Sequence, residues 1–160
     1  MNVFYLDHNP TTCAKYHNDK HCVKMILEYA QLMSTAHRIL DGDDINPVIY
    51  KATHKNHPSA VWVRQSDLNY DWLYKLFEEL SREYNYRYDK QHLSFTKLKD
   101  FLRYPPDNIP VGEFTQPTPA MPDYCKVDGD SLASYRKYYI NEKSHLAIWK
   151  NREVPEWYEK

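Results

Sequence analysis

Residues 19–40 read DKHCVKMILEYAQLMSTAHRIL, a stretch in which apolar residues recur at spacings of three and four. These residues are Val23, Ile26, Leu27, Ala30, Met33 and Ala36. Such spacing places them on one face of an α-helix. The sequence therefore predicts an amphipathic helix that begins with Asp19 as its N-cap and ends near Leu40, where Asp41-Gly42 provides a stop signal.

Four further segments carry helical patterns. They are 10–17, opened by Asn9-Pro10; a long helix from Pro58 to about Tyr84; 91–102; and 130–150. Apart from the N-terminal residues, no segment has the alternation of a strand. We therefore predict an all-α fold of three to five helices in a single domain, residues 1–160.

A Pro-rich segment interrupts this helical pattern. Six of the ten prolines fall between Pro105 and Pro122, which excludes a helix there. Long loops of this kind are often functional. The sequence leaves open whether this one binds a ligand or is a strap over the core.

Composition excludes several classes of protein. The chain has 160 residues, 21 Lys and Arg against 22 Asp and Glu, and 3 Gly, so neither a polybasic protein nor a Gly-rich phosphate loop fits. The 3 Cys match no metal or disulfide spacing, which favours reduced thiols. The sequence has no signal-peptide pattern and no apolar run of membrane length. We therefore expect a cytoplasmic protein, in the host cytoplasm if the protein is viral, without a membrane partner. We also expect a monomer.

The chemistry-bearing cluster nearest the N-terminus is on the 19–40 helix and just before it. His17, His21, Lys24 and Glu28 share one helical face, opposite the stripe of Val23, Ile26, Leu27 and Ala30. Two imidazoles, an amine and a carboxylate together suit acid–base chemistry near neutral pH. The alternative is a solvated face with one favourable Lys24–Glu28 pair.

A metal site is a further alternative, because His17 and His21 have the spacing of two ligands on a helix, with His54 and His57 elsewhere. No HExxH motif or structural-zinc spacing accompanies them. We therefore predict no metal ligand.

Two other clusters suit nucleic acid. His54, Lys55 and His57 precede a helix N-terminus, which favours a phosphate, although ordinary capping explains them equally well. Residues 131–152 interleave aromatic residues with basic ones, a mixture suited to phosphates and unstacked bases. The alternative is a solvated helix face with its aromatic residues in the core. The basic residues are Arg136, Lys137, Lys143, Lys150 and Arg152.

Three motifs, in this order, resemble the pyrimidine-dimer DNA glycosylase (phage endonuclease V-like) family. Asp19-Lys20-His21 is followed by Glu28, seven positions after the His, like the family's Asp-Gln-His and catalytic Glu. Asn56-His57-Pro58 leads into an aromatic-rich helix through Arg82, Tyr86 and Arg87. The tail from Arg152 to Lys160 is similar to the family's Arg-Pro-Thr-Trp-Tyr-Lys. The chain is also similar to phage proteins of like length.

The resemblance implies an all-α DNA glycosylase and AP lyase that needs no metal or cofactor and acts on a damaged or modified pyrimidine. In this family the chain's α-amine attacks the sugar and a carboxylate assists, so the implied catalytic residues are Glu28, with His21 beside it, and the N-terminal Met1 and Asn2. Because Asn2 usually blocks removal of Met1, the amine is expected on Met1, or on the side chain of Lys24.

DNA is the implied partner. The expected nucleic-acid contacts are His17, Lys20, His54, Lys55, His57, Arg136, Lys137 and Lys143. The other reading is a nucleic-acid- or nucleotide-binding module that has the scaffold without the lyase chemistry.

Overall fold

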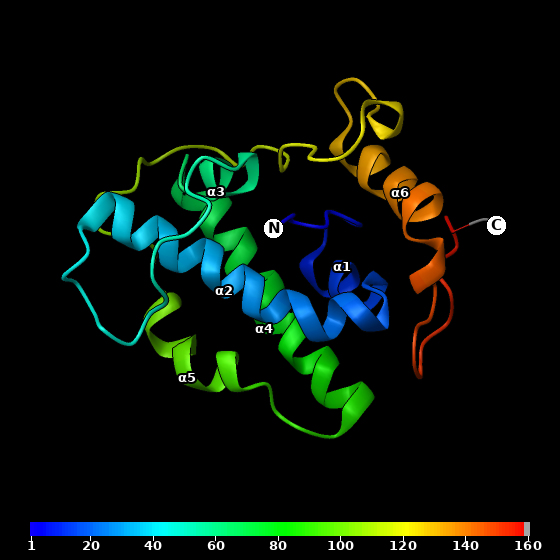
Figure 1. Ribbon diagram of the computed structural model, residues 1–160, viewed down its shortest axis with the longest axis horizontal. Coiled ribbons are helices and arrows are strands. Elements are labelled where there is room, and N and C mark those ends of the chain that lie inside the picture. Colours follow the sequence, from blue (N-terminus) through cyan, green and yellow to red (C-terminus); the bar gives the residue numbers. More distant parts are fainter. Residues whose placement is uncertain (159–160) are drawn as a thin grey trace.

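The computed structural model describes residues 1–158, and these form an all-α fold (Figure 1). The described residues contain six α-helices: α1 Pro10–Tyr16, α2 Asp19–Asp41, α3 Pro58–Val63, α4 Asp67–Tyr88, α5 Leu93–Leu102 and α6 Ser131–Glu142. Two short 3-10 helices, η1 Asp123–Cys125 and η2 Ser144–Leu146, flank α6. Within residues 1–158 no strand forms, apart from an isolated bridge between Val127 and Asp130. The all-α prediction is confirmed, but the described residues contain six α-helices where three to five were predicted.

The long helix predicted from Pro58 is two helices. Arg64 ends α3, and the Ser66 side chain accepts a hydrogen bond from the Asn69 N–H to begin α4. Ser66 followed by Asp67 is an ordinary helix start. The prediction of one continuous helix was wrong because this capping signal stood inside an uninterrupted apolar pattern.

Three other helix ends differ from the sequence prediction. The N-cap of α2 is Asn18, whose side chain accepts from the His21 N–H, and not Asp19. His92 caps α5, which begins at Leu93, two residues later than predicted. The last helix ends at Glu142 because the chain turns back toward α2, where the Asp19 N–H donates to the Ile148 carbonyl over 2.8 Å.

The apolar stripe predicted for α2 is rotated in the structure. Val23 and Leu27 are 41% and 38% exposed, whereas His21, Met25 and Tyr29 are buried. The prediction treated His21 as a surface residue. His21 can be buried because its ring nitrogen Nδ1 pairs with the Tyr139 hydroxyl. The Tyr29 hydroxyl is likewise paired, with His17.

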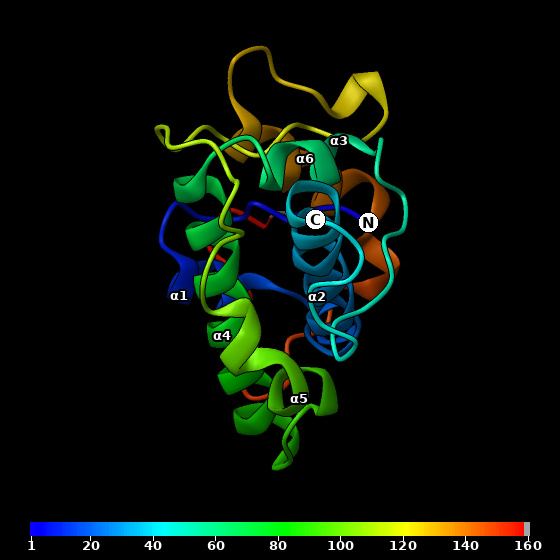
Figure 2. The same ribbon diagram turned by 90° about the vertical axis from the view of Figure 1, so that its left-hand side faces the viewer.

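Helix α4 is the central packing element, in contact with α1, α2, α3 and α5. Helix α6 lies on the far side of the N-terminal segment, residues 1–7, which crosses between α2 and α6 (Figures 1 and 2). The Pro-rich segment passes over α3 and the start of α4 as a strap: the Trp62 indole donates to the Thr115 carbonyl over 3.0 Å, and Ser66 donates to the Glu113 carbonyl over 3.0 Å.

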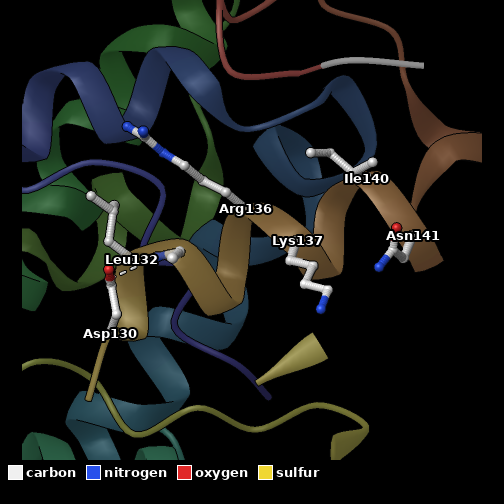
Figure 3. A pocket seen from close by; sticks show the side chains of 7 residues that line it. Asp130, Leu132, Arg136, Lys137, Ile140 and Asn141 are labelled. Carbon is white, nitrogen blue, oxygen red and sulfur yellow. Dashed lines mark hydrogen bonds between the residues drawn. The ribbon is translucent and has the colours of Figure 1, made fainter. Parts of the chain in front are cut away.

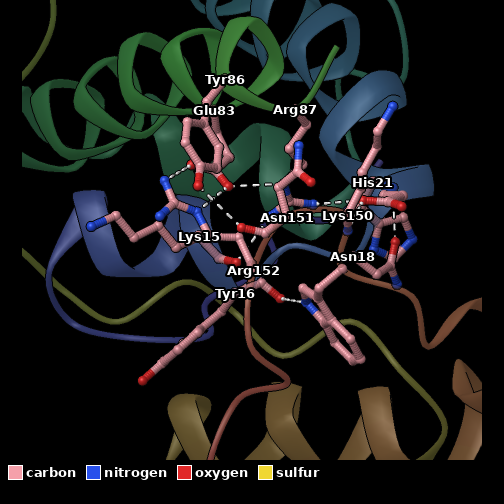
Figure 4. A network of polar contacts seen from close by, with 12 residues as sticks. Lys15, Tyr16, Asn18, His21, Glu83, Tyr86, Arg87, Lys150, Asn151 and Arg152 are labelled. Atoms are coloured by element: carbon pink, nitrogen blue, oxygen red, sulfur yellow. Dashed lines mark hydrogen bonds and ion pairs between the residues drawn. The ribbon is translucent and has the colours of Figure 1, made fainter.

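A buried ionic cluster fastens the C-terminal segment to the helices (Figure 4). The Glu83 carboxylate accepts from Arg87 over 2.8 Å and from two nitrogens of Arg152 over 2.9 Å each. Arg87 is fully buried and also donates to Asp19 over 3.1 Å. The guanidinium of Arg152 lies 3.9 Å from the ring centre of Tyr86. This cluster joins α2, α4 and the chain after α6.

The predicted docking of the tail is also present. The Trp157 ring lies 5.7 Å from Tyr16, and the Arg136 guanidinium lies 5.2 Å from the Trp157 ring. Glu159 and Lys160, the end of the tail motif, lie outside the described residues.

The substitution Glu83→Gln tests the cluster. Because it removes the charge that pairs with the buried Arg87 and leaves that guanidinium only the partly exposed Asp19, we expect the free energy of unfolding to fall by about 3 kcal/mol. Glu79→Gln is the matched control, since Glu79 pairs with the exposed Arg82 and should cost less than about 1 kcal/mol. Urea unfolding followed by circular dichroism measures both, and equal losses would contradict the prediction.

Candidate active site

The central feature of the site is a short ion pair between the N-terminus and α2. The amino group of Met1 lies 3.1 Å from Oε1 of Glu28. The two side chains are only 10% and 12% exposed, so the pair is largely shielded from solvent. An amine and a carboxylate in contact supply two groups that covalent amine catalysis can use, a nucleophile and a group that can take its proton.

The second carboxylate oxygen of Glu28 is available for chemistry. Oε2 is buried and accepts no hydrogen bond from the residues 1–158 that the structure describes, although the exposed Lys24 ammonium lies 3.5 Å away. Buried carboxylate oxygens are normally hydrogen-bonded, and exceptions deserve a functional explanation. The arrangement lets Glu28 hold the amine through one oxygen while the other receives a proton or faces a developing positive charge.

His21 lies beside this pair, in contact with the N-terminal segment. Its ring stacks on Phe4 with centres 4.1 Å apart, and its Nδ1 is 2.6 Å from the Tyr139 hydroxyl of α6. Burial, reinforced by nearby positive charges that include Lys24 and the N-terminus, lowers the pKa of His21 to about 2. The imidazole is therefore neutral at physiological pH.

His17 is in the core and not on the surface. Its Nδ1 donates to the Cys13 carbonyl over 2.7 Å, and its Nε2 is 2.7 Å from the Tyr29 hydroxyl. Burial lowers its pKa to about 4. The structure therefore separates His17 from Lys24 and Glu28, and the four residues do not form one solvated face.

The other cationic and histidine residues predicted to contact nucleic acid near the N-terminal half are mostly on the surface. Lys20, His54 and Lys55 are exposed, and His57 is the N-cap of α3, where its Nδ1 accepts from the Ser59 N–H over 3.1 Å. Burial, the positive N-terminus and His54 lower the pKa of His57. The N-terminal end of α3 and the Met1–Glu28 pair thus act on each other electrostatically. Among the described residues, no group of three or more His, Cys, Asp or Glu is placed to hold a metal ion.

A sequence model of the family described as pyrimidine dimer DNA glycosylase matches residues 1–96. The chain belongs to this family. The match contains Met1, His21, Lys24 and Glu28 and ends before α6. Neither a curated protein nor a solved structure matches the chain. No helix in residues 1–158 has both the length and the apolar character needed to cross a membrane.

The basic residues of the C-terminal part lie beyond the glycosylase match. Arg136 and Lys137 are neighbours on α6 but point in different directions (Figure 3). Arg136 donates to the Leu6 carbonyl over 2.9 Å and pairs with Asp7, so it holds the N-terminal segment. Lys137 is exposed and lines a hollow of about 430 Å³ on α6, while the Lys143 ammonium lies 5.1 Å from the Tyr138 ring.

Sequence reasoning missed three residues that shape the candidate site. Phe4 stacks on His21, Tyr139 binds His21, and the Tyr29 hydroxyl accepts from the Phe4 N–H over 3.2 Å. The uninterrupted apolar run of residues 3–6 was the available signal, because such a run predicts a buried segment. Nothing in the sequence pairs these residues across the chain.

The two buried histidines can be tested by NMR. With pKa values of about 4 and about 2, the rings of His17 and His21 should show no titration between pH 5 and pH 8. The unfolded chain gains protons on these rings below its ordinary histidine pKa of about 6.5, so the free energy of unfolding should fall as pH drops from 6.5 toward 4. The urea-unfolded protein is the control. A His21 signal that titrates near 6.5 in the folded protein would contradict the assignment.

Proposed function

We propose that this chain is a DNA N-glycosylase with lyase activity whose nucleophile is the amino group of Met1 and whose catalytic carboxylate is Glu28. The observation that carries the proposal is the 3.1 Å contact between these two groups in a shielded site. Membership of the pyrimidine dimer DNA glycosylase family supplies the class of substrate, a damaged pyrimidine in DNA.

The reaction follows from this geometry. The neutral amine attacks C1′ of the sugar while the bond from C1′ to the base breaks, and the base leaves with the electron pair and takes up a proton. Glu28 stabilises the developing positive charge on the sugar and accepts a proton from the attacking nitrogen. The sugar ring then opens as the C1′–O4′ bond breaks and O4′ takes up a proton, which leaves an imine between C1′ and the amine nitrogen. Loss of a C2′ proton from this imine expels the 3′ phosphate and cleaves the strand.

The roles of the neighbouring residues follow from their positions. Lys24 balances the charge of Glu28 and, with an exposed ammonium, is also the alternative amine. His21 is neutral, so it packs against the N-terminal segment and offers a weak dipole to the site but no charge. Lys20, Lys55 and His54 are exposed, and Lys143 acts electrostatically on His21. We assign them to the phosphates of the bound strand.

Borohydride trapping tests the reaction. Incubation with a UV-irradiated duplex and borohydride should give a covalent protein–DNA adduct, because borohydride reduces the imine. Glu28→Gln should lower the trapping rate at least about 100-fold, the usual contribution of a proton-transfer group. Glu78→Gln is the control, since Glu78 pairs with Lys75 on α4 and should trap like the unchanged chain.

Peptide mass mapping of the adduct identifies the nucleophile. The expected modified atom is the N-terminal nitrogen, and Lys24→Ala should leave the adduct in place. An adduct on Lys24 would show that the nucleophile is the side-chain amine of Lys24 and not the amino group of Met1. Absence of both adduct and base release, with DNA binding retained, would support the alternative of a binding module without lyase chemistry.

The DNA contact has its own test. The formal charge of the whole chain is −1, so binding must depend on a few local cations. Lys20→Ala should reduce the slope of log affinity against log salt by about 0.9, the value of one phosphate contact. Lys75→Ala is the matched control, because Lys75 lies on α4 and is exposed like Lys20. Fluorescence anisotropy from 50 to 200 mM salt measures both variants. Equal slopes for Lys20→Ala and Lys75→Ala would show that Lys20 does not contact a phosphate.

A further inference from the structure

The N-terminal segment is buried without any secondary structure to satisfy its backbone. Val3, Phe4, Tyr5 and Leu6 are all less than 5% exposed. Buried backbone groups need hydrogen-bond partners, and in this segment side chains supply them. The Phe4 N–H donates to Tyr29, the Phe4 carbonyl accepts from the Cys13 thiol, and the Leu6 carbonyl accepts from Arg136.

Among these three contacts, the one nearest the reactive end is made by Tyr29. Phe4 is three residues from Met1, and Tyr29 directly follows Glu28 on α2. Consecutive residues of one helix therefore hold the carboxylate and anchor the chain that carries the amine. Any movement of the Tyr29 hydroxyl changes the position of Met1 relative to Glu28.

The Tyr29 hydroxyl is in turn fixed by His17. The Cys13 carbonyl can only accept, so His17 Nδ1 carries the ring hydrogen and Nε2 accepts. Tyr29 must then donate its hydrogen to Nε2 over 2.7 Å, which directs a lone pair to the Phe4 N–H. The low pKa of His17, about 4, keeps this arrangement the same across physiological pH.

We propose that Tyr29 and His17 are positioning residues that hold the amino group of Met1 in line with Glu28 for attack on the sugar. This inference rests on the proposed function. Neither residue touches substrate. Their effect should therefore fall on the chemical step and leave DNA binding unchanged, since small displacements of a reacting group can lower rates by about 100-fold.

The protein contains a matched control for Tyr29. The Tyr70 hydroxyl lies 2.9 Å from His37 Nε2 and donates to the Leu102 carbonyl over 2.7 Å. Tyr29 and Tyr70 are both fully buried, and each links a histidine to one backbone group. Tyr70 binds α5 and not the N-terminal segment. Loss of either hydroxyl should therefore have a similar effect on folding, but only Tyr29 should affect catalysis.

The test compares Tyr29→Phe with Tyr70→Phe by single-turnover borohydride trapping on a UV-irradiated duplex. We expect the trapping rate at saturation to fall about 10- to 100-fold for Tyr29→Phe, with the half-saturating concentration unchanged within about twofold. Tyr70→Phe should trap like the unchanged chain. Equal rates for the two variants, or a loss confined to half-saturation, would overturn the positioning role.

A second pair of variants covers the case in which Tyr29→Phe does not fold. His17→Leu removes the acceptor for the Tyr29 hydroxyl, whereas the amide oxygen introduced by His17→Gln can still accept. We expect His17→Gln to recover most of the rate that His17→Leu loses, with circular dichroism confirming that both fold. The same rate in both variants would count against the inference.

Glu28→Gln separates the two proposals. If it abolishes trapping while Tyr29→Phe and His17→Leu keep it, only the positioning role fails. If Glu28→Gln traps as fast as the unchanged chain, the proposed function fails and the positioning role fails with it.

Discussion

The burial of residues 3–6 in an extended conformation is the constraint on which the site depends. An extended segment inside a helical protein has no neighbouring strand, so its N–H and carbonyl groups must be satisfied by side chains. Those side chains come from three helices: Cys13 from α1, Tyr29 from α2 and Arg136 from α6. The segment that leads to Met1 is therefore held by side chains from three helices, so we expect the geometry of the Met1–Glu28 contact to depend on how these helices pack.

The unusual content of 15 Tyr and 8 His has a structural explanation in the same terms. Three buried His–Tyr pairs join different parts of the chain: His17 with Tyr29, His21 with Tyr139, and His37 with Tyr70. Each pair buries two rings and satisfies a hydroxyl and a ring nitrogen at once. These pairs provide hydrophobic contact area together with directional hydrogen bonds, which few combinations of side chains offer.

The ionic cluster around Glu83 plays a complementary part. It holds the chain after α6 against α2 and α4, while the adjoining Trp149 indole donates to the Tyr16 carbonyl over 2.7 Å. Burial raises the pKa of Glu83, but the hydrogen bonds and charges of Arg152 and Arg87 outweigh this effect and leave the pKa below its ordinary value. The carboxylate therefore remains charged at neutral pH. By fixing the chain that follows α6, the cluster helps to keep Tyr139 and Arg136 on the N-terminal segment.

The sequence by itself determined the all-α class and the approximate place of most helices, and it identified His21, Lys24 and Glu28 as candidate site residues. The 3.6-residue periodicity and the Asn9-Pro10 cap are local signals, and the order of three motifs, with the spacing of His21 and Glu28 among them, carried the resemblance to the glycosylase family. The tertiary structure alone decided which groups meet. It placed Met1 on Glu28, moved His17 and His21 into the core, and turned Val23 and Leu27 outward. Periodicity reports only which face of a helix is apolar, whereas these placements depend on hydrogen bonds between residues as far apart as His21 and Tyr139, which no local pattern encodes.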